Sequence, residues 1–383
     1  MLGLANVLSA SSSTDQETYS LALDGAGDYL ATALVPNKDV GTFSFWFKVN
    51  ELKDYNTLFE NAVNGDDWEA WVDGDGDLNF RTDAGDVVLT KATAISIGAW
   101  YHVAITYTVS GGGVLYLNGA AVHTDSDVAG SRPTPEAMSI GGGALNTDLN
   151  GSIDDFAVFN VALNADAVAA IYNNGRPFNL TNDYGDYDQS AALVAYWKMF
   201  DGAFDDKANG IVHDAHNPGY GAEMVTNGTF DSASGWTISG EPGWAISGGT
   251  LTYTDNTGSS ATGFADHLAH GDFTDGAIYK IEFDIIDTHT ILLYIKGGSP
   301  AVNGEHAPGH YVYYVAAGTS ASTGIRFAAS QVEANGSIDN LSVKKLNGYP
   351  GVTAAQATFS TDTPSKAPRG YSLKCDGTGD FLN

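Results

Sequence analysis

The sequence predicts an all-β protein built from tandem antiparallel β-sandwiches of the jelly-roll type. Short runs that alternate apolar and polar residues recur along the chain, as in Thr42–Asn50 (TFSFWFKVN), and Gly, Asn and Asp turns separate them. The 46 glycines fit many tight turns, and long helical periodicity is nearly absent. A length of 383 residues exceeds what one core usually organises, so we expect more than one domain.

The first sandwich is expected at residues 19–175, after a polar and flexible lead at residues 1–18. Tyr101–Thr108 (YHVAITYT) and Val114–Asn118 (VLYLN) alternate in the same way around a Ser-Gly-Gly-Gly turn, which predicts a hairpin. One segment, NADAVAAIYN, has a helical pattern. It begins at Asn164, a suitable N-cap, and glycine follows it as a stop.

A connecting segment with one strand (ALVAYWKM) is expected at residues 176–221, followed by a second sandwich at residues 222–346. The alternating runs of this second unit include residues 279–286 and 337–345. Residues 347–370 are rich in Pro, Thr and Ser, and that composition predicts a linker.

The last segment, residues 371–383, repeats the opening strand of the chain. YSLKCDGTGDFL at residues 371–382 matches YSLALDGAGDYL at residues 19–30 in register. Such a match is typical of an internal repeat. Two interpretations stay open: the chain is cut within a second copy of its first domain, or this strand completes a sheet in a neighbouring subunit by strand addition.

The composition is strongly acidic, because 46 Asp and Glu stand against 17 Lys and Arg, for a net charge of −29. Such a surface repels phosphate backbones and anionic membranes, so we expect no nucleic-acid partner. No segment is apolar over the length that spans a bilayer, so we expect no membrane insertion. The single cysteine, Cys375, excludes an intrachain disulfide, and the N-terminus lacks the basic region of a signal peptide.

The landmarks of the first sandwich resemble, in order, those of the laminin-G-like jelly rolls among the concanavalin A-like lectins. The matching segments are LALDGAGDYL, GTFSFWFKV, DGDGDLNFRTD, GAWYHVAITYTVSGGGVLYLNGAAV, MSIGGG and LNGSIDDFAVFNVALNADAVAAIYNNG. The resemblance covers residues 19 to about 174. It implies a sandwich of two antiparallel sheets and a role in binding rather than in catalysis.

The second sandwich resembles the carbohydrate-binding jelly rolls of the family-4/9 type at its two ends, VTNGTFDSASGWTISG and NGSIDNLSVKKL. Tandem modules of these two kinds on acidic chains also resemble structural proteins of tailed-bacteriophage virions. That resemblance implies a virion location, as a capsid decoration, tail or fibre component, with self-assembly and contacts to other virion proteins.

Acidic residues near the ends of both sandwiches predict structural Ca²⁺ sites, because Ca²⁺ prefers oxygen ligands. The candidates in the first sandwich are Asp24, Asp28 and Asp154. Asp339 is the candidate in the second, with Asn227 and Asp231 as further ligands. The alternatives are Asx turns in the first sandwich and a strand-end turn in the second.

Exposed aromatic side chains can stack on sugar rings, so tryptophans are candidate ligand-binding residues. These candidates are Trp68 and Trp71 in the first sandwich and Trp236 and Trp244 in the second. The alternative for each of them is a place in the core.

Catalysis is not expected from these residues. The paired-carboxylate pattern E-x-D-x-x-E of glycosidases on this fold is absent, as are a Gly-x-Ser-x-Gly elbow and a phosphate loop. DGDGD at residues 73–77 lacks the later Gly and Glu of an EF-hand loop and predicts a hairpin tip. His102 is expected to be structural.

The sequence therefore predicts a non-enzymatic virion structural protein whose lectin-like modules serve self-assembly and contact with host glycans. One alternative is a secreted or cell-surface carbohydrate-binding adhesin of a bacterium. Another is an accessory fragment of a glycoside hydrolase.

Overall fold

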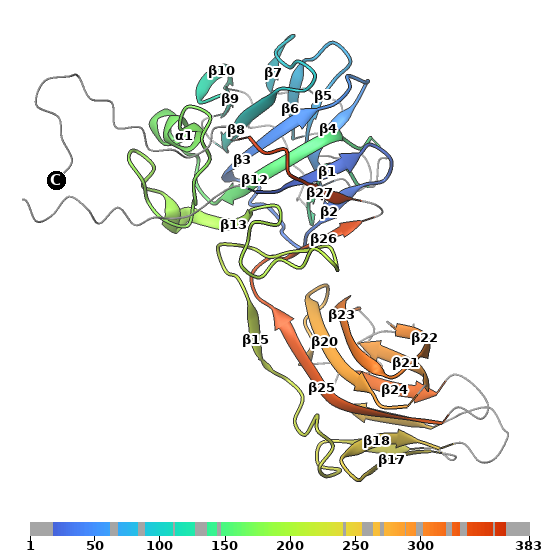
Figure 1. The fold of residues 1–383 in the computed structure, drawn as a ribbon. Helices are drawn as coiled ribbons and strands as arrows, with labels where there is room; N and C mark the ends of the chain where they lie inside the picture. The colour runs from blue at the N-terminus through green and yellow to red at the C-terminus, as the bar shows by residue number, and fades with distance from the viewer. Residues whose placement is uncertain are drawn as a thin grey trace, which may run out of the picture.

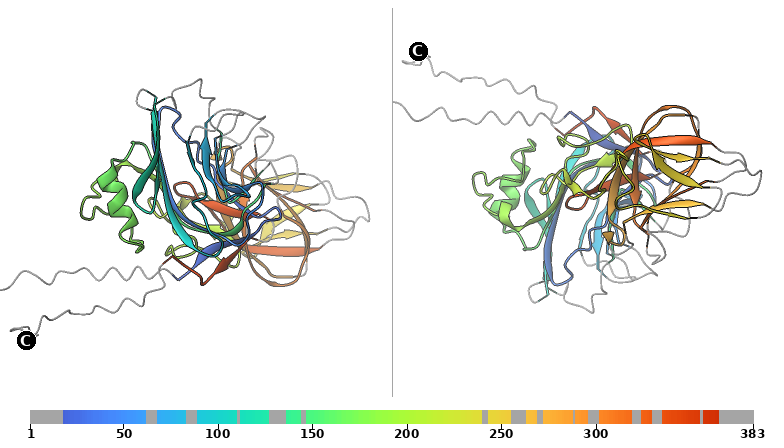
Figure 2. Two further views of the ribbon diagram at one scale, coloured as in Figure 1. Left: turned by 90° about the horizontal axis from the view of Figure 1, so that it is seen from above. Right: turned by 90° about the horizontal axis from the view of Figure 1, so that it is seen from below.

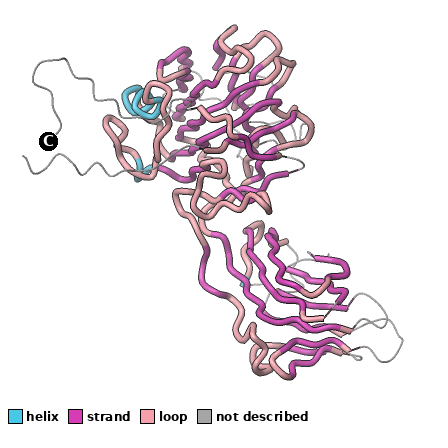
Figure 3. Tube along the Cα trace, viewed as in Figure 1, coloured by secondary structure: helices cyan, strands magenta, loops and turns pink. Residues whose placement is uncertain are grey.

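The molecule consists of two β-sandwiches, the first in the upper part of Figure 1 and the second below it. The computed structural model describes residues 18–61, 68–82, 89–109, 112–126, 136–143, 147–239, 243–254, 263–268, 272–287, 289–295, 302–318, 324–329, 335–354 and 357–364. The predicted all-β fold is confirmed. Within these residues α1 (Ala165–Tyr172) is the one α-helix, beside a short 3-10 turn, Ser190–Ala192, as the colours of Figure 3 show.

Two antiparallel sheets face each other in the first sandwich, and we call them sheet A and sheet B. Sheet A has the strand order β10 (Ala120–Asp125), β9 (Gly112–Leu117), β8 (Trp100–Thr108), β3 (Val40–Val49), β12 (Asn150–Phe159), β1 (Ser20–Asp24) and β27 (Thr358–Ser360), and β13 (Leu193–Trp197) also pairs with β12. Sheet B has the order β14 (Ile211–Val212), β26 (Gly351–Ala354), β2 (Tyr29–Ala31), β11 (Ser139–Ile140), β4 (Asn56–Glu60), β5 (Glu69–Val72), β6 (Leu78–Arg81) and β7 (Leu89–Lys91).

Alternation along the strands builds the core between these two sheets. Phe43, Phe45 and Phe47 of β3 are all fully buried, as their period-two spacing predicts. Phe45 stacks on Phe156 of β12 with ring centroids 4.8 Å apart. The predicted hairpin is present, because β8 and β9 pair from Val103 opposite Leu117 onward.

Helix α1 covers the outer face of sheet A, as both views in Figure 2 show. It begins after Asn164, whose side-chain oxygen accepts a hydrogen bond from the Ala167 N–H at 2.8 Å, so the predicted N-cap is confirmed. Asn173 ends it in the left-handed conformation. Val168 and Ile171 pack in a second apolar cluster with Tyr196. Both faces of sheet A are therefore buried.

The second sandwich also has two antiparallel sheets, which we call sheet C and sheet D. Sheet C has the order β17 (Trp244–Ser247), β18 (Thr250–Tyr253), β25 (Gly336–Leu346), β20 (Ile278–Ile285) and β23 (Gly309–Ala316), and β15 (Tyr220–Glu223) also pairs with β25. Sheet D has the order β16 (Thr237–Ser239), β19 (Phe264–His267), β24 (Ile325–Ala329), β21 (His289–Ile295) and β22 (Val302–His306). Aromatic and aliphatic side chains from both sheets fill the core between them.

The second sandwich is inserted into the first, which corrects the linear order that the sequence suggested. After the insertion the chain returns to sheet B as β26, between β14 and β2, and to sheet A as β27, beside β1. The predicted linker at residues 347–370 therefore contributes two strands to the first sandwich. The segment 176–221 likewise holds β13, β14 and the start of β15 rather than one strand.

Asp362 fastens this returning segment to sheet A. Its carboxylate forms an ion pair with Lys48 and accepts a hydrogen bond from Trp100 Nε1 at 3.2 Å. Its backbone oxygen accepts a hydrogen bond from Ser20 Oγ at 2.7 Å. The segment is thus tied to three strands of the sheet.

We expect Asp362→Asn to lower the free energy of unfolding of the first sandwich by about 1–2 kcal/mol, because it removes a half-buried charge-assisted contact. Chemical denaturation monitored by tryptophan fluorescence measures this change. The exposed Asp188→Asn serves as the matched control and should leave the midpoint in place. Equal midpoints for both variants would contradict the role of Asp362.

Where the chain passes between the sandwiches, a small apolar cluster joins them. Ile211 of the first sandwich packs with Ile278 and Leu346 of the second. The Tyr314 hydroxyl lies 3.2 Å from the Tyr220 hydroxyl and donates to the Asp206 carboxylate at 3.2 Å. Two chain connections and this cluster hold the sandwiches together.

The two ends of the chain carry the remaining expectations. The lead at residues 1–17 and the repeated strand at residues 371–383 lie outside the described residues. In the part of the chain that the structure describes, no helix is long and apolar enough to cross a membrane.

Candidate functional site

The outer face of sheet B carries polar side chains where the outer face of sheet A is apolar and covered. Along β5, Ala70 and Val72 point into the core, so Glu69 and Trp71 point outward. Trp71 accordingly lies outside the core clusters although it is only 5% exposed. This outer face is the part of the first sandwich on which hydrogen-bonding groups are arranged in rows.

Two rows of side chains run across the strands of sheet B. The strand register places Glu60 opposite Ser139 on one side and Glu69 on the other, and Glu69 opposite Arg81. The neighbouring row consists of Thr57, Trp71, Asn79 and Thr90. Directly opposite residues have β-carbons about 5 Å apart, so each row is a continuous line of contacts.

In the first row, which runs from Ser139 through Glu60 and Glu69 to Arg81, an ion pair links two side chains and a backbone segment covers one end. Arg81 binds the Glu69 carboxylate at 2.7 Å, and Glu69 accepts a hydrogen bond from Thr57 Oγ1 at 3.3 Å. Gly143 passes directly over Glu60: a β-carbon there would meet Glu60 Oε1 at 2.2 Å, so a larger residue would have to displace this carboxylate. Glu60 and Glu69 are at most 1% exposed and belong to the interior of this face.

The other end of the face is open and aromatic. Tyr55, directly before β4, is 40% exposed and its ring lies 5.7 Å from the ring of Trp71. The Arg81 guanidinium lies 5.3 Å from the centroid of the same indole. The exposed Tyr55 therefore packs against the buried Trp71. Trp71 in turn contacts Arg81, which is paired with Glu69. This stack, Tyr55–Trp71–Arg81–Glu69, is the candidate functional site.

Of the four predicted tryptophans, only Trp71 lies at this site. Trp68 sits inside the first core, 5.0 Å from the ring of Tyr107. Trp236 and Trp244 are 8% and 4% exposed and pack in the second core. These three are core residues, which corrects their prediction as stacking platforms, and their apolar surroundings are the reason.

The structure does not bring the three predicted calcium ligands of the first sandwich together. Asp24 lies opposite Asn150 in the register of β1 and β12, and Leu21 lies opposite Ile153, so Asp154 stands four residues further along the strand. That separation is about 13 Å. The Asp24 side chain instead accepts the Ala26 N–H at 2.9 Å, which is the alternative Asx turn.

Asp28 and its surroundings use their oxygens on backbone donors. Asp28 accepts the Asp24 N–H at 3.0 Å, and Asp148 accepts the Gly27 N–H at 2.7 Å. These residues therefore fit a turn better than a calcium site. Calcium binding by this sandwich stays a prediction.

Asp339 lies on β25 opposite Asp284 of β20, and its carboxylate accepts the Asn340 N–H at 2.7 Å. The opening turn of the second sandwich does lie near it, because the Leu341 N–H donates to the Gly228 oxygen at 2.9 Å. Asn227 bonds Ser232, and Asp231 accepts a hydrogen bond from Thr229. Among the residues that the structure describes, no group of three His, Cys, Asp or Glu is placed to hold a metal ion.

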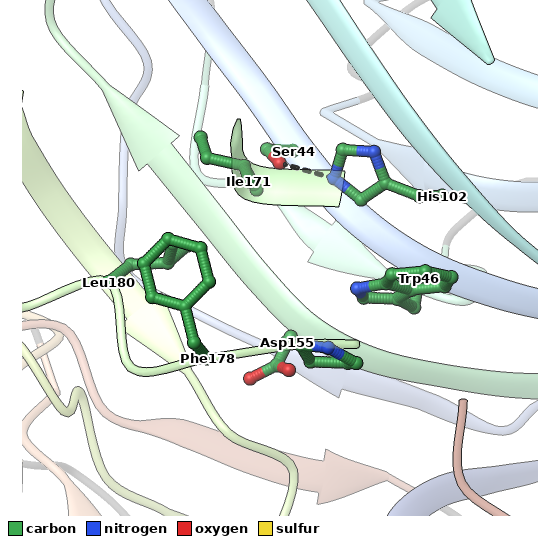
Figure 4. A pocket seen from close by; sticks show the side chains of 8 residues that line it. Ser44, Trp46, His102, Asp155, Ile171, Phe178 and Leu180 are labelled. Carbon is green, nitrogen blue, oxygen red and sulfur yellow. Dashed lines mark hydrogen bonds between the residues drawn. The ribbon is translucent and has the colours of Figure 1, made fainter. Parts of the chain in front are cut away.

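A small pocket under α1 contains Ser44 and His102 in hydrogen-bond contact at 3.0 Å, with Asp155 on its opposite wall (Figure 4). His102 is fully buried, and burial lowers its pKa to about 3, which makes the imidazole a poor base. Its Nδ1 has no hydrogen-bond partner among the described residues, so no carboxylate orients it. The cavity, about 10 Å³, has room for about one water. These features fit the structural role expected for His102, which stays a prediction.

The sequence analysis missed three residues of the site, Tyr55, Arg81 and Glu69, and Tyr55 is the exposed one among them. It stands outside the alternating pattern, between Asp54 and Asn56, at the start of a strand. The signal that could have found it is an aromatic residue between two polar residues just before a strand, because a residue in that position is not expected to fill the core.

Comparison with known proteins agrees with this architecture. Residues 24–169, which lie in the first sandwich, match the family model described as the concanavalin A-like lectin/glucanases superfamily. A rat protein (Rattus norvegicus), the sushi, von Willebrand factor type A, EGF and pentraxin domain-containing protein 1, is 26% identical over 139 residues. That match covers 33% of this chain and 4% of the rat protein, so the chain spans only a small part of that relative.

Two solved structures match this chain at low similarity. The heptameric SAP-like pentraxin of Limulus polyphemus is 20% identical with a TM-score of 0.35, over 41% of this chain and 82% of that one. A candidate carbohydrate binding protein from Bacteroides ovatus is 17% identical with a TM-score of 0.39, over 52% of this chain and 56% of that one.

Proposed function

We propose that the first sandwich binds a glycan, without catalysis, at the stack formed by Tyr55, Trp71, Arg81 and Glu69. The observation that carries this proposal is the exposed Tyr55 ring on a sheet face otherwise lined with hydrogen-bonding groups. A sugar has an apolar face and a rim of hydroxyls, so an aromatic ring beside polar groups suits it. The match of residues 24–169 to a lectin/glucanases superfamily model supports the same function.

The buried part of the stack gives Tyr55 a fixed orientation. Trp71 supports the tyrosine ring from below, and Arg81 is held against Trp71 by its ion pair with Glu69. A ring that is already ordered loses little conformational entropy when a ligand stacks on it. The four residues therefore act as one preorganised surface.

The virion role and the self-assembly implied by resemblance stay predictions, and so does the bacterial adhesin. All three are compatible with glycan binding by the first sandwich, and identification of the protein by mass spectrometry in purified virions would separate them.

A glycan array tests the proposal with Tyr55→Ala and Trp71→Ala against the unchanged chain. We expect each variant to weaken binding about tenfold or more, because aromatic anchors of interfaces contribute at least about 1.5 kcal/mol. Tyr184→Ala is the matched control: Tyr184 is 62% exposed but packs beside Phe178, away from sheet B. Undiminished binding in both Tyr55 and Trp71 variants would overturn the proposal. Parallel measurements with EDTA test the calcium prediction.

A further inference from the structure

We infer that the glycan taken at the Tyr55 stack carries no acidic groups, so that sulfated, phosphorylated and uronic-acid glycans are rejected. This inference rests on the proposed function and names the ligand class of the same site. It follows from the charges that surround Tyr55.

The cations near the site are already engaged. Arg81 is paired with Glu69 at 2.7 Å, and its guanidinium lies over Trp71. The Lys53 ammonium points to the Gly25 turn, where it lies 3.5 Å from the carbonyl oxygen. Lys91 lies opposite Leu78, a core residue, so both residues are on the inner face of sheet B. Asn79 and Thr90 are on its outer face. An acidic glycan would have to displace Glu69 to gain Arg81, the cation that lies over the Trp71 ring.

The anions beside Tyr55 remain at the surface. Asp54 is exposed, and so is Asp75 at the tip of the neighbouring hairpin. The tip lies next to Asp54, because a β-carbon on Gly74 would be 3.7 Å from Asp54 Oδ1. Asp73 in the same tip accepts the Asp75 and Asp77 N–H groups at 3.0 and 2.9 Å, so it shapes the turn.

These exposed carboxylates repel a second anion. A like charge at contact distance in water costs close to one tenfold step in affinity. The net charge of −29 adds repulsion at longer range, which salt screens over about 8 Å. Neutral and amino sugars meet no such penalty.

The experiment uses the full chain and the neutral glycans that bind it on the array. Each is compared by calorimetry with its own sulfated and carboxymethylated derivative at about 150 mM NaCl. We expect the acidic derivatives to bind at least tenfold more weakly than the neutral parent. In Asp54→Asn/Asp75→Asn that gap should narrow by about tenfold, while affinity for the neutral parent changes less than about threefold.

The outcomes separate the two proposals. Acidic derivatives that bind as tightly as their parents, with both weakened in Tyr55→Ala, overturn this inference and leave glycan binding in place. Binding of neutral and acidic glycans that is undiminished in both Tyr55→Ala and Trp71→Ala overturns the proposed function itself. A penalty for acidic derivatives that persists unchanged in the Asp54/Asp75 variant assigns it to other groups and overturns the role given to these carboxylates.

Discussion

A chain that ends at Asn347 is expected to lose the first sandwich, although the cut lies far beyond the residues that form most of it. The truncation removes β26, which stands between β14 and β2 in sheet B, and β27, which pairs with β1 in sheet A. It leaves β1 and β2 with unpaired edges and the Leu30 side chain without Gly351, which packs against it. Both sheets are opened by the loss of these strands, so we expect the first sandwich to show no cooperative unfolding transition, while the second sandwich keeps its own.

The converse change should be tolerated. Tyr220 and Leu346 are opposite each other where β15 pairs with β25, so the two ends of the insertion lie about 5 Å apart. Replacing residues 222–345 by a few Gly and Ser residues should therefore leave the first sandwich folded, with a modest loss from exposing Ile211. Circular dichroism and thermal melting of the two variants provide the measurement. Two results would together contradict the insertion: cooperative melting of the first sandwich in the truncated chain, and its absence in the excised chain.

The elements of the fold could be predicted because they depend on local alternation. The period-two pattern in Thr42–Asn50 places three phenylalanines on one side of β3, and they are buried as expected. The insertion could not be predicted in this way. β26 and β27 have four and three residues, too few to show a period, and their partners β2 and β1 lie more than 300 residues earlier in the chain. For this reason the Pro-, Thr- and Ser-rich composition of residues 347–370 predicted a linker in place of these two strands.

The site was only partly predictable for a related reason. Trp68 and Trp71 are three residues apart on an extended segment, so they point to opposite sides, but alternation does not say which side is the core. The neighbours across the sheet decide it, because Trp68 meets Phe43 and Phe80 whereas Trp71 meets Tyr55 and Arg81. The separation of Asp24 from Asp154 could not be predicted either, because it depends on the register of β1 and β12.

The first sandwich is expected to lose stability steeply in mild acid because of His102. Burial lowers the pKa of this imidazole from 6.5 to about 3, so the folded state holds it neutral while the unfolded state takes up a proton below pH 6.5. The stability that depends on the neutral ring is present above pH 6.5 and is lost as the pH falls towards 3. The loss is roughly 1.4 kcal/mol per pH unit, or about 2 kcal/mol between pH 6.5 and 5.

His102→Gln tests this directly, since glutamine is uncharged and can still donate to Ser44. The variant should be less stable at pH 7 but should show a shallower dependence between pH 6.5 and 5, by close to one proton. His213, whose pKa burial lowers to about 4, keeps its own contribution in both proteins, so the difference in slope isolates His102. Ser44→Ala is the control: it removes the hydrogen bond and lowers the whole curve by about 1 kcal/mol without changing its slope.

A direct titration makes the test independent of how well the variant folds. In the unchanged chain, the imidazole resonances of His102 should stay at their neutral positions down to pH 5 in nuclear magnetic resonance spectra. A midpoint near 6.5 would mean that water reaches the ring in the folded state, and the acid dependence would then arise elsewhere. A midpoint near 6.5 would also require α1 to move away from sheet A. Trp46 and Tyr172 enclose the imidazole, with ring centroids 5.1 and 6.0 Å from its own.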